Sequence, residues 1–310
     1  MPTSASTRQT ARVEPQSGSE FVVSREEFRP GSATTHSISS VELLGHRIDR
    51  LELDATAKRC HDAVVRKERI HHVSLNAAKV VSARDDQRLA IILRDAQLVT
   101  ADGQSLVWAS RLLGDPLPER VPGIDLMLRL FDIAEMKGFR VFFLGARLDV
   151  LGRALAHLRV RYPRLAIAGS HHGYFDDADG KAICDEINAA RPDILFVAMS
   201  SPRKEYWVSD YGDLLDVPVI IGVGGALDVV AGVVVRAPLW VQRAGFEWAF
   251  RLLQEPRRLW RRYLVTNLRF IGMVAAACGH RMTSADDIAD HSSSKAYQQR
   301  ERHRRDGNGQ

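Results

Sequence analysis

The stretch Asp193-Ile-Leu-Phe-Val-Ala-Met199 decides the fold class, because six consecutive apolar residues follow a single charged one. A short apolar run of this kind is typical of a strand covered on both faces, as in a parallel sheet. Similar strand-like runs alternate with amphipathic helical windows at Ile70 to Leu75, Gln97 to Thr100, Phe139 to Gly145, Leu165 to Gly169 and Val217 to Val223. This alternation predicts an α/β protein with a Rossmann-like, mostly parallel sheet flanked by helices.

The composition predicts an ordered centre between two polar tails. With 310 residues, of which 45% are hydrophobic, the chain can bury one substantial core or two closely packed lobes. Residues 1–40 and 281–310 are polar and poor in large aliphatic side chains, so we expect both tails to be disordered. Between them we expect an α/β core over residues 41–235 and a helical appendage over residues 236–280.

Cysteine usage and hydropathy indicate a protein of the reducing cytoplasm. The three cysteines are widely spaced and form no C-x-x-C pattern, so the sequence predicts neither a disulfide framework nor a zinc site. The pairs His71-His72 and His171-His172 place their side chains in diverging directions, and we predict no metal. The N-terminus lacks the apolar segment of a secretory signal, and Phe270 to Cys278 is too short to span a bilayer.

The C-terminal region interleaves arginines with tryptophans at helical spacing. From Arg236 to Arg269 there are eight arginines against two carboxylates, a balance of +6, whereas the whole chain carries +5. Guanidinium groups match phosphate oxygens and indole rings settle at the headgroup boundary, so the segment suits an anionic membrane surface or a diphosphate group. A solvated helix whose aromatic side chains cover the core is the alternative.

The carboxyl ends of parallel strands are where ligands bind in α/β sheets, and this rule selects Asp102. It follows the run Gln97 to Thr100 and precedes a helix that begins near Gln104, so its carboxylate should project at the edge of the sheet. A carboxylate in this place can act as a general base. The alternative is that Asp102-Gly103 only makes a turn and caps the next helix.

Three further loops carry groups that suit a phosphorylated ligand. Arg120 precedes an amphipathic helix, Leu126 to Lys137, which Gly123 or Asp125 could cap, and an arginine there can bind phosphate. Arg203 and Lys204 open another helix, where two cations oppose the helix dipole and call for an anion. Gly224, in a glycine turn, permits close approach of a ligand, and Asp228 could hold a ribose or sugar hydroxyl. A surface loop and the packing of a turn are the alternatives.

In combination these segments resemble the WecG/TagA/CpsF family of bacterial glycosyltransferases. The resemblance runs from about Val41 to Tyr263 and rests on motifs in the family's order: Ser74-Leu-Asn76, Ala101-Asp102-Gly103, Glu119-Arg120-Val-Pro-Gly-Ile-Asp125, Phe143-Leu-Gly145, Gly173-Tyr-Phe175, Pro202-Arg-Lys-Glu205, Gly222-Val-Gly-Gly-Ala-Leu-Asp228 and the stretch from Arg236-Ala-Pro-Leu-Trp240 to Tyr263. It implies an inverting, metal-independent transfer of a sugar from a UDP-sugar to a polyprenyl-diphosphate-linked saccharide during synthesis of a cell-surface polysaccharide, with no cofactor.

The resemblance also implies roles for individual residues. Asp102 would deprotonate the acceptor hydroxyl, while Ser74, Asn76 and Arg120 would lie in the sugar-nucleotide pocket. The arginines of the appendage would close over the active site and address the lipid diphosphate or the membrane: Arg236, Arg251, Arg258 and Arg261.

Two departures from the family pattern bear on the donor sugar. The family commonly has Thr-Ala-Asn where this chain has Ser74-Leu75-Asn76, a change that keeps the hydroxyl and the amide. It commonly has glutamine where this chain has Lys204, which exchanges a neutral group for a cation. Lys204 could therefore pair with a uronic acid or a donor phosphate, so the donor could be UDP-linked N-acetylmannosamine, glucuronic acid or a related hexose.

Two other classes of protein remain as alternatives at this point. An arginine-rich helix can also bind nucleic acid, but that function would leave the Asp102 and Gly224 loops without a purpose. An NAD-linked oxidoreductase would need a complete glycine fingerprint, and the last glycine is missing here. We expect a peripheral protein on the cytoplasmic face of the cell membrane, with no nucleic-acid partner and with self-association plausible.

Overall fold

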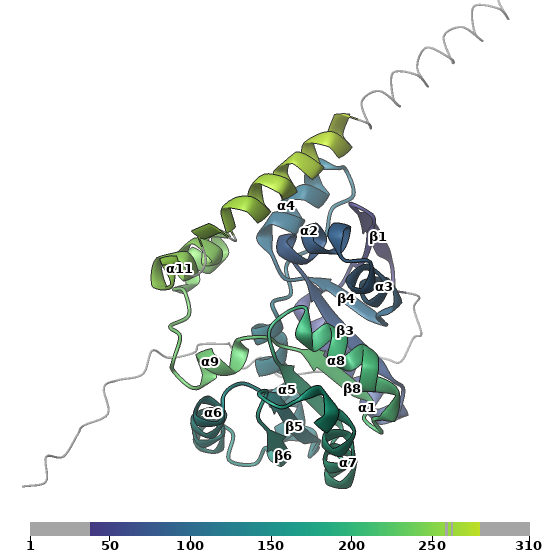
Figure 1. Ribbon diagram of the computed structural model, residues 1–310, viewed down its shortest axis with the longest axis vertical. Coiled ribbons are helices and arrows are strands. Elements are labelled where there is room, and N and C mark those ends of the chain that lie inside the picture. The colour runs from purple at the N-terminus through teal and green to yellow at the C-terminus, as the bar shows by residue number, and fades with distance from the viewer. Residues whose placement is uncertain (1–37, 258–259, 262, 280–310) are drawn as a thin grey trace, which may run out of the picture. The chain divides into compact units, whose positions relative to one another are not determined.

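The computed structural model describes residues 38–257, 260–261 and 263–279, and its main element is a six-stranded parallel sheet (Figure 1). The strand order is β4-β3-β8-β7-β5-β6. The strands are β3 (Ile70–Leu75), β4 (Leu98–Ala101), β5 (Arg140–Gly145), β6 (Ala166–His171), β7 (Ile194–Ala198) and β8 (Val219–Gly222). The predicted α/β class is confirmed, and each predicted strand-like run overlaps one of these strands.

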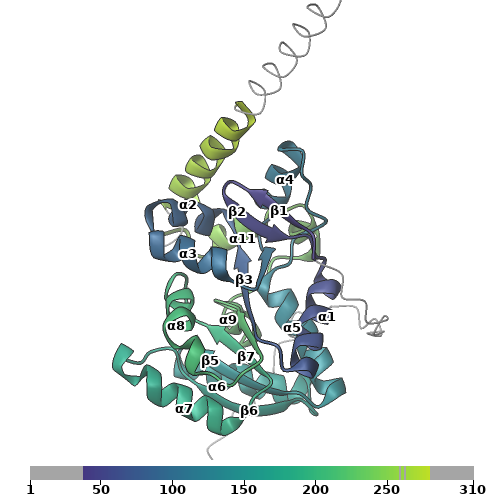
Figure 2. The same cartoon turned by 90° about the vertical axis from the view of Figure 1, so that its right-hand side faces the viewer.

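Helices cover both faces of the sheet, which explains why most residues of its strands are apolar. On one face α1 (Leu53–Arg66) packs against α5 (Gly123–Lys137), and both contact β8. On the other face α3 (Gln87–Asp95), α8 (Arg203–Tyr211) and α7 (Gly180–Ala190) follow one another, as Figure 2 shows. The remaining helices are α2 (Ala77–Asp85), α4 (Gln104–Leu112), α6 (Leu148–Arg161), α9 (Ala226–Val230), α10 (Leu239–Arg243) and α11 (Glu247–Gln254).

Two helix starts place groups at the carboxyl edge of the sheet. Asn76 caps α2, because its side chain accepts a hydrogen bond from the backbone N–H of Lys79 at 3.0 Å. Helix α5 begins at Gly123, with Pro122 at the cap position. The expectation that Gly123 or Asp125 caps this helix is therefore wrong. Asp125 instead lies in the first turn, where its carboxylate is available to a side chain from elsewhere in the chain.

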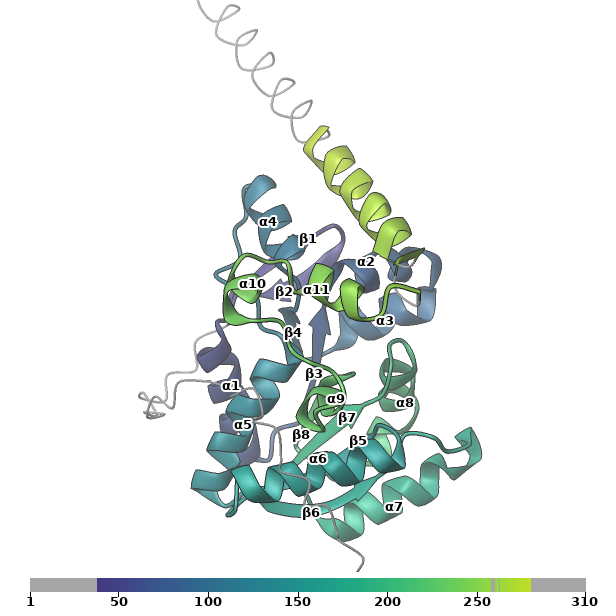
Figure 3. The ribbon, with the colours of Figure 1, turned by 90° about the vertical axis from the view of Figure 1, so that its left-hand side faces the viewer.

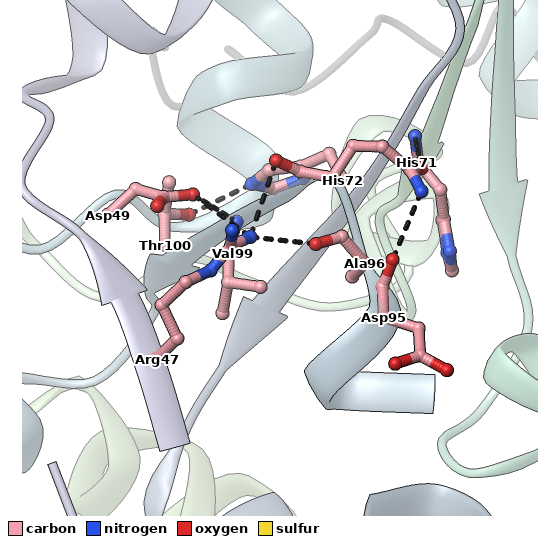
Figure 4. A network of polar contacts seen from close by, with 9 residues as sticks. Arg47, Asp49, His71, His72, Asp95, Ala96, Val99 and Thr100 are labelled. Carbon is pink, nitrogen blue, oxygen red and sulfur yellow. Dashed lines mark hydrogen bonds and ion pairs between the residues drawn. The ribbon is translucent and has the colours of Figure 1, made fainter. Parts of the chain in front are cut away.

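An antiparallel hairpin that the sequence did not predict, β1 (Ser40–Leu43) and β2 (His46–Asp49), lies beside β4. Its strands of four residues are too short to show a clear periodicity. The buried carboxylate of Asp49 accepts a hydrogen bond from the backbone N–H of Val99 at 2.9 Å, and Arg47 donates to the carbonyl of Ala96 at 2.7 Å (Figure 4). The hairpin thereby protects the outer edge of β4, a common requirement of edge strands.

The last described helical residues, 263–279, pack against the part of the core formed by α2, α3 and α4. Phe270, Met273 and Val274 are buried there in one apolar cluster with Val80 and Leu89. Burial of an apolar side chain of this size stabilises a fold by about 1.5–3 kcal/mol. This helix is consequently part of the packed core, whereas α11 before it is attached differently, as described below.

Candidate active site

Asp102 lies at the carboxyl end of β4, beside the end of β3. The last pair in the register of these strands is Leu75 with Ala101, and the N–H of Asp102 donates to the carbonyl of Leu75 at 2.7 Å. The residue is half-buried. Burial raises the pKa of its carboxyl to about 6, with Glu247 acting in the same direction and with Lys79, Arg120 and Lys204 opposing. A carboxylate with this pKa is suited to take up a proton near neutral pH.

Two buried lysines that act on the Asp102 carboxyl, Lys79 and Lys204, share another carboxylate, that of Glu205. The ammonium groups of Lys79 and Lys204 lie 2.8 and 2.9 Å from the same carboxylate oxygen of Glu205, and Lys79 also donates to the carbonyl of Ser74. The other oxygen of Glu205 accepts a hydrogen bond from the hydroxyl of Ser201 at 2.8 Å. Lys79, Lys204 and Glu205 are 5%, 7% and 1% exposed. We call Lys79, Lys204 and Glu205 the buried charge cluster.

The pKa values in this cluster follow from its geometry. Burial alone would raise the pKa of Glu205, but the two ammonium groups outweigh it and lower that pKa to about 2. Burial and the nearby Lys79 lower the pKa of Lys204 to about 8. Glu205 thus supplies an anion to only one of the two cations at the start of α8, Lys204. The other, Arg203, donates to the carbonyls of Gly173 and Phe175 at 2.8 and 2.9 Å.

The sequence analysis did not select Lys79 or Glu205 as site residues. Lys79 was recognisable as the one cation in the otherwise apolar start of a helix, Ala77-Ala-Lys79-Val-Val81, directly after the Asn76 loop. No local signal pairs it with Glu205, which is far away in the chain. The two meet because α2 follows β3 and α8 follows β7, and the sheet brings both strand ends to one edge.

Ser74 and Asn76 lie at this edge but have different contacts. Ser74 is buried, and within the described part of the chain its hydroxyl has no hydrogen-bond partner. A Cβ added at Gly123 would lie 3.3 Å from that hydroxyl, so the absence of a side chain at Gly123 leaves it space. Asn76 uses its carbonyl oxygen to cap α2, which leaves its amide N–H groups for another partner.

The glycine turn after β8 brings the appendage to the same edge. Gly224 has a φ of +56°, which favours glycine. A Cβ added at Gly225 would lie 3.2 Å from a guanidinium nitrogen of Arg251 and 3.3 Å from a carboxylate oxygen of Asp228. Arg251 of α11 and Asp228 of α9 therefore both approach this turn, and Figure 3 shows α9, α10 and α11 on one side of the molecule.

Arg120 and Arg236 both contact the carboxylate of Glu247. Arg120 donates to one carboxylate oxygen of Glu247 at 2.8 Å, and the Nε of Arg236 lies 3.5 Å from the other. Arg236 also pairs with Asp125 at 2.6 Å, and one of its buried terminal nitrogens has no hydrogen-bond partner among the described residues. The pairs Arg120–Glu247 and Asp125–Arg236 connect segments more than a hundred residues apart, so no local sequence signal predicts them.

Of the arginines assigned to the acceptor, Arg261 is not among the groups that the structure brings to Asp102. Arg261 is exposed, and its guanidinium lies over the ring of Trp260 at 5.3 Å from the ring centre. Arg258 lies outside the described residues. Arg236 and Arg251, by contrast, lie at the carboxyl edge of the sheet through the contacts given above.

A hollow lies elsewhere, at the end of β6. Its volume is about 680 Å³, and its lining includes His171, Tyr174, Asp179 and Arg203. Strand β6 is at the opposite edge of the sheet from β4, so this hollow is not the space beside Asp102. The convergence of titratable groups, rather than hollow size, identifies the candidate active site.

The described residues contain neither a metal-binding cluster nor a helix that could span a membrane. There, no group of three or more His, Cys, Asp or Glu side chains is arranged to hold a metal ion. The ring of His72 contacts the hydroxyl of Thr100 at 2.9 Å, as expected of a buried histidine in a core. No helix in the described ranges has both the length and the apolar character that crossing a bilayer requires.

Comparisons with known proteins agree on one family. A family model described as the glycosyl transferase WecG/TagA/CpsF family matches residues 41–283. A protein of Bacillus spizizenii named N-acetylglucosaminyldiphosphoundecaprenol N-acetyl-beta-D-mannosaminyltransferase is 37% identical over 192 residues, which are 62% of this chain and 74% of that relative. A Staphylococcus aureus protein of the same name is 36% identical over 189 residues, 61% of this chain and 74% of the relative.

Proposed function

The chain belongs to the WecG/TagA/CpsF family of glycosyltransferases, and from this premise we propose that it moves a sugar from a UDP-sugar to a polyprenyl-diphosphate-linked saccharide. The observation that carries the proposal is Asp102, a half-buried carboxylate with a raised pKa at the sheet edge where Arg120, Lys204 and Arg251 gather. The names of the relatives support a diphosphate-linked acceptor, since they specify an N-acetylglucosaminyl-diphosphoundecaprenol acceptor for those proteins. The setting would be synthesis of a cell-surface polysaccharide.

The proposed reaction is a single displacement with inversion at the anomeric carbon. The acceptor hydroxyl oxygen attacks that carbon, Asp102 takes the hydroxyl proton, and the bond to UDP breaks with its electron pair going to the β-phosphate. Arg120, Arg236 and Arg251 would stabilise the charge that develops on UDP, in the role that a divalent ion has in many other transferases. Ser74, Asn76, Gly224 and Asp228 would complete the donor site.

The donor sugar is the least constrained part of the proposal. Lys204 is already paired with Glu205, which it shares with Lys79, so its ammonium would reach a uronic acid or a donor phosphate only as a second partner. We expect one of UDP-linked N-acetylmannosamine, glucose or glucuronic acid to raise the Tm in a thermal-shift panel and then to be transferred, as radiolabel, to a polyprenyl-diphosphate acceptor. If none of these sugars is transferred under conditions in which the Bacillus spizizenii relative is active, the proposed function is wrong.

The acceptor's lipid requires a membrane, and the appendage offers a surface for one. Trp240, Phe246, Trp248, Leu253 and Trp260 are 74%, 52%, 43%, 80% and 48% exposed. Arginines interleave with them, and each cation near an anionic surface contributes about 1 kcal/mol. We propose that this surface binds the cytoplasmic face of the membrane from one side and leaves the sheet edge facing the lipid diphosphate.

Substituting two of these exposed side chains tests the membrane proposal. The variant Trp240→Ala/Leu253→Ala is expected to bind vesicles that contain anionic lipid at least about tenfold more weakly, because roughly 1.5–3 kcal/mol is associated with each large apolar side chain that leaves water. Leu148→Ala is the matched control, since Leu148 is 70% exposed on α6. Truncation before Arg236 is less informative, because it removes the buried Phe270 and Met273. Equal sedimentation of both variants with vesicles would exclude this surface.

A further inference from the structure

Helix α11 is held in place by polar contacts. None of its residues Glu247–Gln254 is buried, although it carries Trp248 and Leu253. Helices of soluble proteins are normally attached through a buried apolar face. Its apolar contacts are limited: Phe250 and Leu252 are only half-buried, and Trp248 meets the ring of Tyr263 edge-on at 6.1 Å between ring centres. The hydrogen bonds and ion pairs at the two ends of α11 therefore make a large contribution to its attachment.

The first residue of the helix makes the stronger set of these contacts. Glu247 accepts a hydrogen bond from Arg120 at 2.8 Å and lies 3.5 Å from Arg236, and the three side chains are 31%, 17% and 11% exposed. Arg120 precedes α5, and Arg236, the first residue of the appendage, is paired with Asp125 of α5, so both arginines are held against the α/β core. At the other end, Gln254 exchanges two hydrogen bonds with the backbone of Val235, at 2.9 and 3.3 Å.

The same contacts determine that Arg251 is the side chain of α11 that lies near the sheet edge. Arg251 is one turn along the helix from Glu247, on the same face, and its guanidinium lies against Gly225. A shift of α11 would move Arg251 away from the glycine turn and from Asp228. The carboxylate of Glu247 also acts on Asp102 through space, together with the cations Lys79, Arg120 and Lys204.

We infer that Glu247 is a positioning residue, whose carboxylate anchors α11 to the body of the protein through Arg120 and Arg236 and so places Arg251 beside the Gly224–Gly225 turn. The anchoring of α11 is inferred from the contacts of Glu247 with Arg120 and Arg236 alone. Its effect on catalysis rests on the proposed function, because it assumes that Asp102 is the base and that Arg251 meets the diphosphate.

Glu247 also affects the pH dependence of the reaction, in a way that loss of packing alone would not. Asp102 must be deprotonated to act, so kcat/KM of the natural protein rises with pH through about 6. The negative charge of Glu247 disfavours a second negative charge on Asp102 and raises its pKa. Replacing Glu247 by glutamine removes that charge and releases Arg120, and both changes lower the pKa of Asp102. The acidic limb of the profile should therefore move to lower pH.

The test uses the full chain with Glu247→Gln, with Glu42→Gln as a matched control on the exposed side of β1. Hydrogen exchange of the amides of residues 247–254 is expected to be roughly tenfold faster in Glu247→Gln, as a charge-assisted hydrogen bond is lost. Glu42→Gln should leave exchange and the pH profile unchanged. Glu247→Asp, which keeps the charge on a shorter side chain, should loosen the helix but retain the position of the acidic limb.

Hydrogen exchange and the pH profile test the anchoring of α11 and the electrostatic link to Asp102 separately. Unchanged exchange in Glu247→Gln overturns the anchoring. An acidic limb that stays in place or moves to higher pH overturns the electrostatic link to Asp102. If no sugar is transferred by any variant, the proposed function fails, while the exchange measurement still decides the anchoring.

Discussion

Replacing Asp102 by asparagine is expected to lower kcat for sugar transfer by about 10²- to 10⁴-fold, the range that a positioned general base contributes. Asparagine has nearly the same shape and cannot accept the proton. The backbone hydrogen bond from residue 102 to Leu75 is unaffected by the change, so the loop should keep its position. Binding of the UDP-sugar, measured by calorimetry, should remain close to that of the natural protein.

Asp95→Asn is the matched control for this substitution. Asp95 ends α3 just before β4, at the other end of the strand that leads to Asp102, and it pairs with the exposed Arg94. The control should retain activity within a factor of a few, since surface pairs of this kind contribute little. Activity of Asp102→Asn equal to that of the control would take Asp102 out of the chemical step and leave it as a residue of the loop.

Replacing Glu205 by glutamine is expected to reduce the free energy of unfolding by about 3–5 kcal/mol, because it leaves two buried cations without their shared anion. Glu205 is 1% exposed, so water cannot take over the role of the carboxylate. Urea unfolding of both proteins, followed by tryptophan fluorescence, measures the difference. A loss below 1 kcal/mol would show that the lysines find another partner, such as Asp102.

Two further measurements isolate the charge effect at Glu205. Ser201→Ala removes only the hydroxyl that donates to Glu205 and should reduce stability by about 1 kcal/mol. The pKa of Glu205 is lowered from an ordinary 4.5 to about 2, so its contribution is complete above about pH 4.5 and is lost as the pH falls toward 2. The stability difference between the natural protein and Glu205→Gln should accordingly shrink in that acidic range.

Local sequence signals determined the strands of the sheet and the position of Asp102. Apolar runs such as Asp193 to Met199 identify covered strands by their composition, and a residue directly after such a run must lie at the carboxyl edge of a parallel sheet. The same argument placed Asn76, Lys204 and Gly224 at this edge, whereas Ser74 was assigned only through the family resemblance. It could not find the hairpin at Ser40–Asp49, because four-residue strands carry too little pattern.

Only the tertiary structure decided which of these groups meet. Periodicity identifies a strand but not its neighbours, and the order β4-β3-β8-β7 is what brings Lys79 to Glu205. The attachment of α11 through Glu247 likewise joins segments separated by 127 positions, where no local pattern can link them. The sequence by itself therefore determined the sheet and its candidate base, whereas strand order and long-range ion pairs determined the charge around that base, because Coulomb interactions depend on distance in space.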